Sequence, residues 1–312
     1  MGAGVAGPGR MTVHITIAGV GLHGAEHMSR EAEDAVRGAR VVFTSTYNAG
    51  IDAHVRALAP HAELRSSDAH EYAMGAYRPE MYLRMASEVL AAARDAPGVV
   101  MLAPGSALVV DRVTELVVRG AREARLAVRV LPGISSIETV LAQLRYDASR
   151  GLSIVLAQRL VAERVVLDPT RAALVLQPAY YDTLFFAGAP ASCPGRYDAL
   201  AAQLARTWSA EAVMALVATP TAMDARARVF WFRSGELGRV ARLISPRHTL
   251  FVPPERAATI DERFVARTRT WDALEIERDA RGEPVAQRRV EVPEDLAEES
   301  RELARRWEAR EM

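Results

Sequence analysis

The sequence contains no lysine, one cysteine and no long hydrophobic run. All 39 basic residues are therefore arginines, which excludes Schiff-base catalysis and the P-loop lysine that binds nucleotide phosphates. Cys193 alone cannot form an internal disulfide framework or a cysteine-based metal cluster. Since no segment approaches the roughly 18 consecutive apolar residues of a membrane span, we expect no membrane partner.

Excess charge is also missing, because 39 acidic residues balance the 39 arginines. The chain thus lacks the basic excess typical of nucleic-acid-binding proteins, and we expect no nucleic-acid partner. Its 312 residues predict two domains of about 150 residues each. Residues 1–11 are rich in Gly and Ala and lack the apolar core of a signal peptide. We interpret them as a disordered leader, with Met11 as an alternative start, and expect a cytoplasmic protein.

The segment 12–150 alternates between strand-like and helix-like patterns, which predicts an N-terminal α/β domain. Alternation of this kind is typical of a mostly parallel sheet covered by helices on both faces. We expect strands at 13–20, 41–43, 99–102 and 127–131, and helices at 30–37, 79–94, 108–124 and directly after Ser136.

A second α/β domain is predicted for 151–255, followed by a charged tail over 256–312. Its expected strands are 153–157, 173–177, 213–218, 229–232 and 249–252. The Pro- and Gly-containing segment 187–196 is expected to be a loop. In the tail, arginine and glutamate dominate, and we interpret 293–312 as one helix with a solvated face. The adjacent aromatics Phe230, Trp231 and Phe232 are expected in a strand that contributes to the core and to subunit contacts.

Three glycine-containing loops follow strands of the first domain: Gly19-Val20-Gly21-Leu22, Pro104-Gly105-Ser106-Ala107 and Pro132-Gly133-Ile134-Ser135-Ser136. Ligands of open α/β sheets bind at the carboxyl ends of strands, where glycine lets backbone N–H groups approach them closely. The three loops together predict a nucleotide-like ligand. The first is not a dinucleotide fingerprint, because the acidic residue expected after the second strand is missing.

The ordered motifs ITIAGVG, GSALVVDR and VLPGISSIETVLAQL resemble the S-adenosylmethionine-dependent tetrapyrrole (corrin/porphyrin) methylase superfamily, over about residues 13–255. Pro-Gly-Ile-Ser-Ser before a helix is the most specific of them. Gly105-Ser106-Ala107 departs from the Gly-Asp-Pro or Gly-His-Pro of relatives, where this loop mainly offers backbone groups to the cofactor. The resemblance implies a homodimeric methyltransferase that holds S-adenosylmethionine, and its product S-adenosylhomocysteine, in a cleft between two α/β domains.

The resemblance also implies which residues contact the cofactor. The residues carried over as cofactor-binding candidates are Gly19, Gly21, Pro104, Gly105, Ser106, Val109, Ser135, Gln177, Leu216 and Thr249.

Tyr72, Arg78 and Tyr82 resemble the Tyr-Arg-Tyr set of one subgroup, the borosin peptide-backbone α-N-methyltransferases. The stretches 151–177 and 248–254 resemble borosin enzymes too, with His248 where relatives tend to have serine. This implies α-N-methylation of backbone amides, with the three residues as the catalytic set. Fungal borosin enzymes carry an apolar core peptide at the C-terminus, whereas this chain ends in RRWEAREM. We therefore expect a separate precursor peptide, as in split borosin systems.

The residue types suit that chemistry. A backbone amide nitrogen is a poor nucleophile, so methylation requires removal of its proton and stabilisation of the charge that develops on oxygen. A phenolate stabilised by a neighbouring guanidinium could be the base, because a nearby cation lowers the pKa of a phenol. A second donor could hold the oxyanion. Arg78 and Tyr82 are four residues apart at a helix start and share one face, whereas Tyr72 must reach in from the preceding loop. No metal is needed.

Several alternatives stay open. The acceptor could be a tetrapyrrole precursor or another small metabolite, and the ample supply of arginine for an acidic acceptor does not decide between them. Tyr77 is a rival for the tyrosine role. The departures at Gly105-Ser106-Ala107 and at His248 leave room for a catalytically inactive binding or scaffold homologue.

Overall fold

A computed structural model of the chain describes residues 13–44, 49–66, 75–186, 195–219, 228–269 and 294–310. It divides into two compact units, Met1–Ala257 and Ala258–Met312. The predicted leader 1–11, the catalytic candidate Tyr72, Cys193 and most of the predicted loop 187–196 lie outside the described residues.

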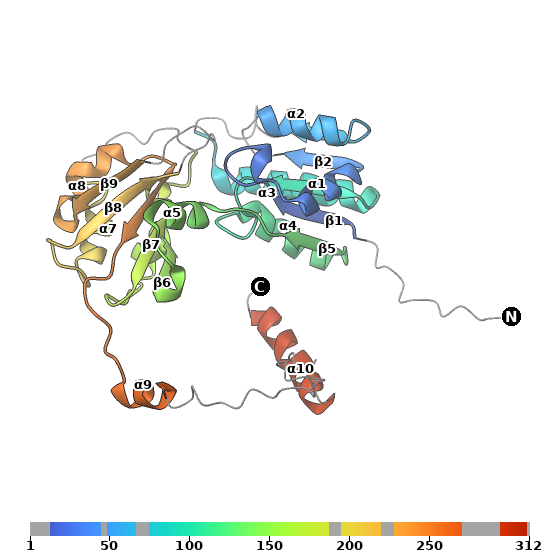
Figure 1. Cartoon of the computed structure of the whole chain (residues 1–312). Helices are drawn as coiled ribbons and strands as arrows, with labels where there is room; N and C mark the ends of the chain where they lie inside the picture. Colours follow the sequence, from blue (N-terminus) through green and yellow to red (C-terminus); the bar gives the residue numbers. More distant parts are fainter. Residues whose placement is uncertain are drawn as a thin grey trace, which may run out of the picture. The chain divides into compact units, whose positions relative to one another are not determined.

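The first sheet is entirely parallel, with strand order β3-β2-β4-β1-β5. Its strands are β1 (Ile15–Gly19), β2 (Val41–Thr44), β3 (Glu63–Ser66), β4 (Val99–Ala103) and β5 (Val128–Leu131). Every residue of β1, β2 and β4 is buried, because parallel sheets are covered on both faces and their strands become continuous apolar runs. The predicted parallel sheet is thereby confirmed (Figure 1).

Two pairs of helices cover the two faces of this sheet. Helices α3 (Arg78–Asp95) and α4 (Arg112–Glu123) pack on one face. On the other face lie α1 (Arg30–Arg37) and α2 (Ala49–Leu58), after a short 3-10 turn at Ala25–His27. Ser29 caps α1 as predicted, because its side chain accepts a hydrogen bond from the backbone N–H of Ala32 at 3.1 Å.

The predicted start of the helix at 108–124 was wrong by four residues. Val110 adopts a left-handed conformation, with φ of 59°, which a helix cannot contain. The helix begins after Asp111, whose Oδ1 accepts a hydrogen bond from the backbone N–H of Thr114 at 3.1 Å. The turn before α4 therefore places residues 108–111 outside the helix.

The second sheet has the order β6-β7-β10-β8-β9, and only its β6–β7 pair is parallel. Its strands are β6 (Leu152–Leu156), β7 (Ala172–Leu176), β8 (Val213–Ala218), β9 (Arg228–Arg233) and β10 (His248–Val252). One face packs against α6 (Ala157–Ala162), α7 (Asp198–Leu204) and α8 (Leu237–Val240). The other packs against α5 (Ser136–Leu144), which follows β5 and so links the two sheets. Further 3-10 turns lie at Ala148–Arg150, Pro178–Tyr180, Ser234–Glu236 and Ala241–Leu243.

All five predicted strands of this second region are present. Of the three adjacent aromatics of β9, Phe232 is buried in the core, as expected, whereas Phe230 and Trp231 are 46% and 50% exposed. The two-sheet α/β fold of the prediction is thus observed within Met1–Ala257.

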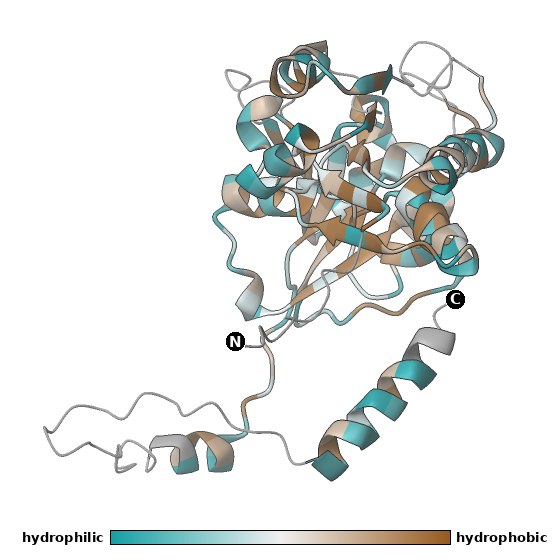
Figure 2. Ribbon diagram, turned by 90° about the vertical axis from the view of Figure 1, so that its right-hand side faces the viewer, coloured by the Kyte–Doolittle hydropathy of each residue, from teal (hydrophilic) through white to brown (hydrophobic). Residues whose placement is uncertain are grey.

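The second unit contains α9 (Glu262–Arg269) and α10 (Glu294–Arg310), the latter where one charged helix was predicted. Ion pairs along α10 join Arg301 to Glu294 and Arg306 to Glu302. Figure 2 shows that α10 is largely hydrophilic, whereas apolar residues concentrate along the strands of the first unit. Within the described ranges, no helix combines the length and apolar character that crossing a membrane requires.

Candidate functional site

The three glycine-containing loops, which follow β1, β4 and β5, pack against one another. Gly21 and Gly105 exchange two backbone hydrogen bonds, each 2.9 Å long. A Cβ atom on Gly19 would lie 2.5 Å from the Gly105 carbonyl oxygen, and one on Gly133 would lie 2.6 Å from the same oxygen. Only glycine permits such backbone approach. Close packing of the loops on one another therefore accounts for these glycines.

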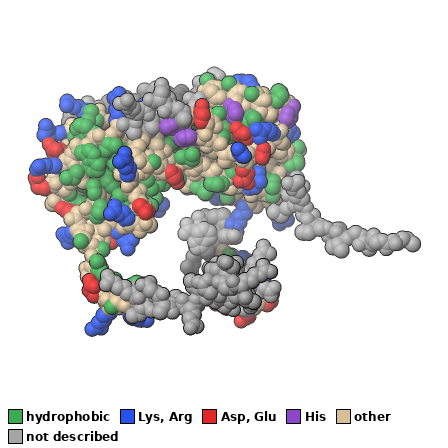
Figure 3. Space-filling view, in the orientation of Figure 1, with side chains coloured by type: hydrophobic (Ala, Val, Ile, Leu, Met, Phe, Trp, Pro, Cys, Tyr) green, Lys and Arg blue, Asp and Glu red, His purple; other side chains and the backbone are tan. Residues whose placement is uncertain are grey.

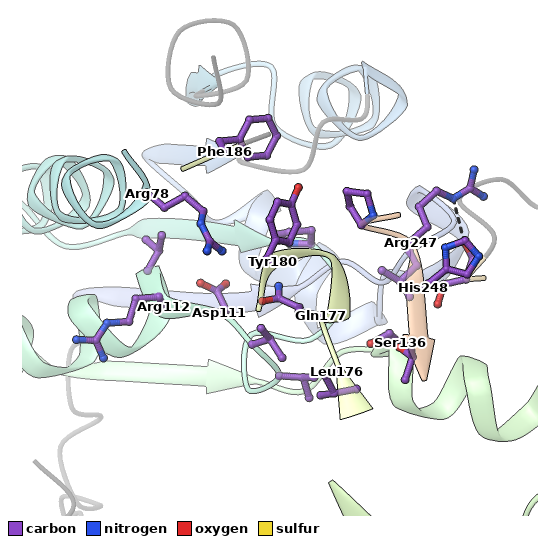
Figure 4. A pocket seen from close by; sticks show the side chains of 18 of the residues that line it. Arg78, Asp111, Arg112, Ser136, Leu176, Gln177, Tyr180, Phe186, Arg247 and His248 are labelled. Atoms are coloured by element: carbon purple, nitrogen blue, oxygen red, sulfur yellow. Dashed lines mark hydrogen bonds between the residues drawn. The ribbon is translucent and has the colours of Figure 1, made fainter. Parts of the chain in front are cut away.

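A cavity of about 490 Å³ lies between the two sheets, within the usual size range of small-molecule sites. The first half supplies Leu22, Arg78, Tyr82, Pro104 and the run Val109–Val113 to its wall, and Ser136 begins α5. The second half supplies Leu176, Gln177, Tyr180, Phe186, Thr219 and the run Pro246–Thr249. Figure 4 shows these side chains converging from elements far apart in the sequence.

Some of the cofactor-binding candidates line this cavity, namely Pro104, Val109, Gln177 and Thr249. Gly19, Gly21 and Gly105 lie in the packed loops behind it. Ser106 and Ser135 are buried and satisfy backbone groups: Ser106 Oγ accepts from Leu108 N–H, and Ser135 Oγ accepts from Ile137 N–H and caps α5.

Leu216 lies apart from the other candidates. Its side chain is fully buried in the core between the second sheet and α6, α7 and α8. Its backbone pairs with Leu250 on one side and Phe230 on the other, because β8 is an inner strand. The structure therefore makes Leu216 a core residue that does not reach the cavity.

The catalytic candidates Arg78 and Tyr82 lie one turn apart on α3, and both line the cavity. The Arg78 guanidinium donates a hydrogen bond to the carbonyl oxygen of Thr183 and lies 4.9 Å from the centre of the Tyr180 ring. Its Nε is buried and has no hydrogen-bond partner among the described residues. The second half of the chain thus holds the Arg78 side chain in the cavity wall, with its Nε–H buried and unpaired within the described ranges.

The backbone next to Arg78 is held in the same way. Gly75 N–H donates to the Phe186 carbonyl at 2.8 Å, and Arg78 N–H donates to the Leu184 carbonyl at 2.9 Å. The rival Tyr77 packs its ring against Phe185, at 5.5 Å between centres, and does not line the cavity. This short antiparallel pairing ties the start of α3 to the loop after β7.

The pKa of Tyr82 is raised, which is opposite to the expectation from the sequence. Burial of the phenol raises its pKa most, and the charge of Asp111 adds to this. The charge of Arg78 and a hydrogen bond from it lower the pKa of Tyr82, but by less. Tyr82 is therefore a protonated hydrogen-bond donor at neutral pH, and desolvation outweighs the cation that was expected to produce a phenolate.

Asp111 is a cavity residue that the sequence analysis missed. It caps α4, lines the cavity and has a raised pKa, chiefly because burial disfavours its charged form. The left-handed Val110 before it is costly for a β-branched residue, and such strain concentrates at functional sites. An aspartate directly before an amphipathic run is an N-cap signature that could have identified it.

The opposite side of the cavity contains Thr219, His248 and Thr249. Thr219 is 6% exposed, and its Oγ1 is buried with no hydrogen-bond partner among the described residues. His248 Nδ1 accepts a hydrogen bond from Ser245 N–H at 3.1 Å, so the neutral ring carries its hydrogen on Nε2. Burial lowers the pKa of His248, which favours that neutral form.

This side fits a cofactor with a polar aromatic edge. An unpaired hydroxyl at Thr219 can donate and accept, and the His248 ring is held with Nε2 as its donor. Gln177, with a left-handed φ of 51°, lines the same cavity. A nucleoside offers the complementary acceptors and donors, so the residues present suit an adenosine-containing cofactor.

Comparison with known proteins identifies the family. The family model described as Tetrapyrrole (Corrin/Porphyrin) Methylases matches residues 14–230. A search of curated proteins found no match.

Three solved structures share the fold over most of both chains. A uroporphyrin-III C-methyltransferase from Thermus thermophilus is 20% identical and superposes with a TM-score of 0.53, covering 77% of this chain and 91% of its own. The cobalt precorrin-4 methyltransferase CbiF is 13% identical, with a TM-score of 0.52 and coverages of 77% and 94%. The methyltransferase CobJ is also 13% identical, with a TM-score of 0.52 and coverages of 79% and 96%.

At these identities the solved structures establish the fold, and the family match over more than half of the chain establishes membership of the family. The predicted two-domain methylase fold is confirmed. The chain therefore belongs to the tetrapyrrole (corrin/porphyrin) methylases and is a methyltransferase of this family, whose methyl donor is S-adenosylmethionine.

Proposed function

We propose that this chain binds S-adenosylmethionine in the cavity between its two sheets and methylates a tetrapyrrole precursor or another small metabolite. The family match carries this proposal. The residues that would hold the cofactor are Pro104, Val109, Gln177, Thr219, His248 and Thr249, all of which line the cavity. When bound, the cofactor supplies an electrophilic methyl group on a sulfonium.

The acceptor class follows from the kinds of methyltransferase that share the fold, two of which act by name on uroporphyrin III and cobalt precorrin-4. Arg78, Arg112 and Arg247 line the cavity. Guanidinium groups pair with carboxylates in a bidentate manner, which suits an acidic acceptor. Arg112 already forms an ion pair with Glu115. Arg78 and Arg247 donate to backbone carbonyl oxygens, so these two guanidinium groups are the better candidates for pairing with an acceptor carboxylate.

A backbone amide is the second candidate acceptor, and the placement of Arg78 and Tyr82 favours it. Both line the cavity, and Tyr82 is protonated at neutral pH. A guanidinium and a phenol hydroxyl that line the cavity can donate to the carbonyl oxygen of an amide, where charge develops during N-methylation. This activity would require a separate precursor peptide.

A homodimer is proposed together with either acceptor. Figure 3 shows apolar side chains gathered on the surface over the second sheet. Ile154, Val213 and Trp231 lie on the face of that sheet that packs against α5, because each is two residues along its strand from a residue packed in the core of that face. They are nevertheless 49%, 53% and 50% exposed. A partner that covers this face would bury them. Light scattering after size-exclusion chromatography tests this, and a monomer at micromolar concentration would contradict it.

Calorimetric titration with S-adenosylmethionine and S-adenosylhomocysteine is the first test of the function. A site of micromolar affinity, about −8 kcal/mol, is expected. Absence of heat at millimolar cofactor would favour the alternative of an inactive homologue.

The acceptor is then identified by transfer of radiolabelled methyl from S-adenosylmethionine. Uroporphyrinogen III and synthetic peptides encoded beside the gene are offered in parallel, and mass spectrometry locates the label. Methylation of the peptide alone would overturn the tetrapyrrole proposal, and methylation of uroporphyrinogen alone would overturn the amide proposal.

A further inference from the structure

We propose that Asp111 accepts the proton that the acceptor loses when it is methylated. The inference rests on the proposed function, because it requires methyl transfer in the cavity between the sheets. It applies to either acceptor, since an amide nitrogen and a tetrapyrrole ring each lose one proton in exchange for the methyl group.

The chemical character of the cavity wall points to this residue. The titratable side chains that line it, among the described residues, are Arg78, Tyr82, Asp111, Arg112, Tyr180, Arg247 and His248. Arginine has no acceptor atom and stays protonated. Burial raises the pKa of both phenols, Tyr82 and Tyr180, so neither is a phenolate at neutral pH.

His248 is a further candidate for the proton acceptor, but the placement of its ring nitrogens is unsuitable. Its Nδ1 already accepts from Ser245 N–H, and Nε2 carries the hydrogen. In Figure 4, His248 and Arg78 lie on opposite sides of the cavity, and Asp111 lies on the side of Arg78 with its carboxylate directed into the space between the labelled residues. Asp111 is thus the carboxylate among these groups, and it lies on the same side of the cavity as Arg78, one of the cations proposed to bind the acceptor.

Local structure holds the Asp111 carboxylate at this place. The left-handed turn at Val110 ends the loop after β4, and Asp111 begins α4 as its N-cap, with Oδ1 bonded to Thr114 N–H. The positive end of the helix dipole favours a carboxylate there, while burial opposes its charge. The net effect is a raised pKa, which makes Asp111 a stronger proton acceptor than an exposed aspartate.

The reaction balances in atoms and charge. For an amide, the nitrogen electron pair forms the N–CH3 bond while the S–CH3 bond breaks and leaves its pair on sulfur. The N–H proton goes to the carboxylate of Asp111, which becomes a carboxylic acid and later releases the proton to water. One cation and one anion thereby give neutral products. Arg78 and Tyr82 would donate to the carbonyl oxygen during this step.

A purely structural role as helix cap is the competing explanation, and Asp111→Asn separates the two. Asparagine caps helices as well as aspartate does, so the variant keeps the cap and loses the base. Asp147 offers a matched control, because it caps the 3-10 turn Ala148–Arg150 by accepting from Ser149 N–H at 2.8 Å and does not line the cavity. Asp147→Asn should leave turnover unchanged.

We expect Asp111→Asn to bind S-adenosylmethionine like the wild type, without a loss of melting temperature, and to lower kcat by about 10²–10⁴-fold. The acid limb of the wild-type pH–rate profile should disappear in the variant. The charged and titratable groups around Asp111 that could contribute to this limb are Arg78 and Tyr82 of α3, Arg112 and Glu115 of α4, and Tyr180. Of these groups Glu115 is the other carboxylate, and Glu115→Gln should keep the limb.

Failure of this inference is distinguishable from failure of the proposed function. A wild type that turns over while Asp111→Asn matches it within about threefold refutes the role of Asp111 alone. The same holds if the variant loses activity only in proportion to a loss of folding or cofactor binding. A wild type that transfers no methyl to either acceptor refutes the proposed function and the proton-accepting role with it.

Discussion

Replacement of Thr219 by valine should change stability and cofactor binding in opposite directions. Thr219 is 6% exposed, and its Oγ1 has no hydrogen-bond partner among the described residues. A buried polar group without a partner costs about 1–3 kcal/mol. Valine has nearly the same shape and removes that cost. The cofactor-free variant should therefore unfold at a higher temperature, by about 2–12 °C for a unit of this size.

Cofactor binding should weaken in the same variant, because the hydroxyl is then unavailable to the ligand. A neutral hydrogen bond contributes about 0.5–1.5 kcal/mol, so the dissociation constant for S-adenosylmethionine should rise by about 2- to 13-fold. Thermal melts with and without cofactor measure both effects in one assay, since ligand stabilisation follows RT ln(1 + [L]/Kd).

Thr16→Val is the matched control for this experiment. Thr16 is 8% exposed in β1 and does not line the cavity, so its replacement should leave the cofactor affinity unchanged. A Thr219→Val variant that melts below the wild type, or binds S-adenosylmethionine as tightly, would refute the assignment of this hydroxyl to the cofactor.

Three further results are expected. Tyr82→Phe should lower methyl transfer at least tenfold with unchanged cofactor affinity, because a donor at the acceptor oxygen is lost; equal turnover in radiolabel assays would remove Tyr82 from the mechanism. Gly133→Ala should destabilise the protein by about 1–3 kcal/mol or more, since the new Cβ would lie 2.6 Å from the Gly105 carbonyl oxygen; an unchanged denaturation midpoint would contradict the loop packing. The lowered pKa of His248 means that the unfolded chain binds the proton more readily, so stability should fall as pH drops below about 6.5. His248→Gln should show a smaller fall in melting temperature between pH 7 and pH 5, and equal falls would indicate that His248 is not desolvated.

Short-range patterns were sufficient to predict most elements of the fold. The buried strands β1 and β4 are continuous apolar runs, and glycines mark the loops that follow them. By contrast, the edge strand β3 was missed because its four residues, Glu63–Ser66, are mostly exposed and polar. The start of α4 was misplaced because a valine, Val110, adopts the left-handed conformation that normally identifies glycine.

The sequence by itself determined the family and the loops around the site, because these depend on local motifs such as Pro132-Gly133-Ile134-Ser135-Ser136. Only the tertiary structure decided which residues form the cavity. It joins Asp111 and Tyr82 of the first half to Tyr180 and Thr219 of the second, and it buries Leu216 in the core. The protonation of Tyr82 was also decided there. A neighbouring arginine is visible in the sequence, whereas the larger effect, loss of water around the phenol, exists only in the packed chain.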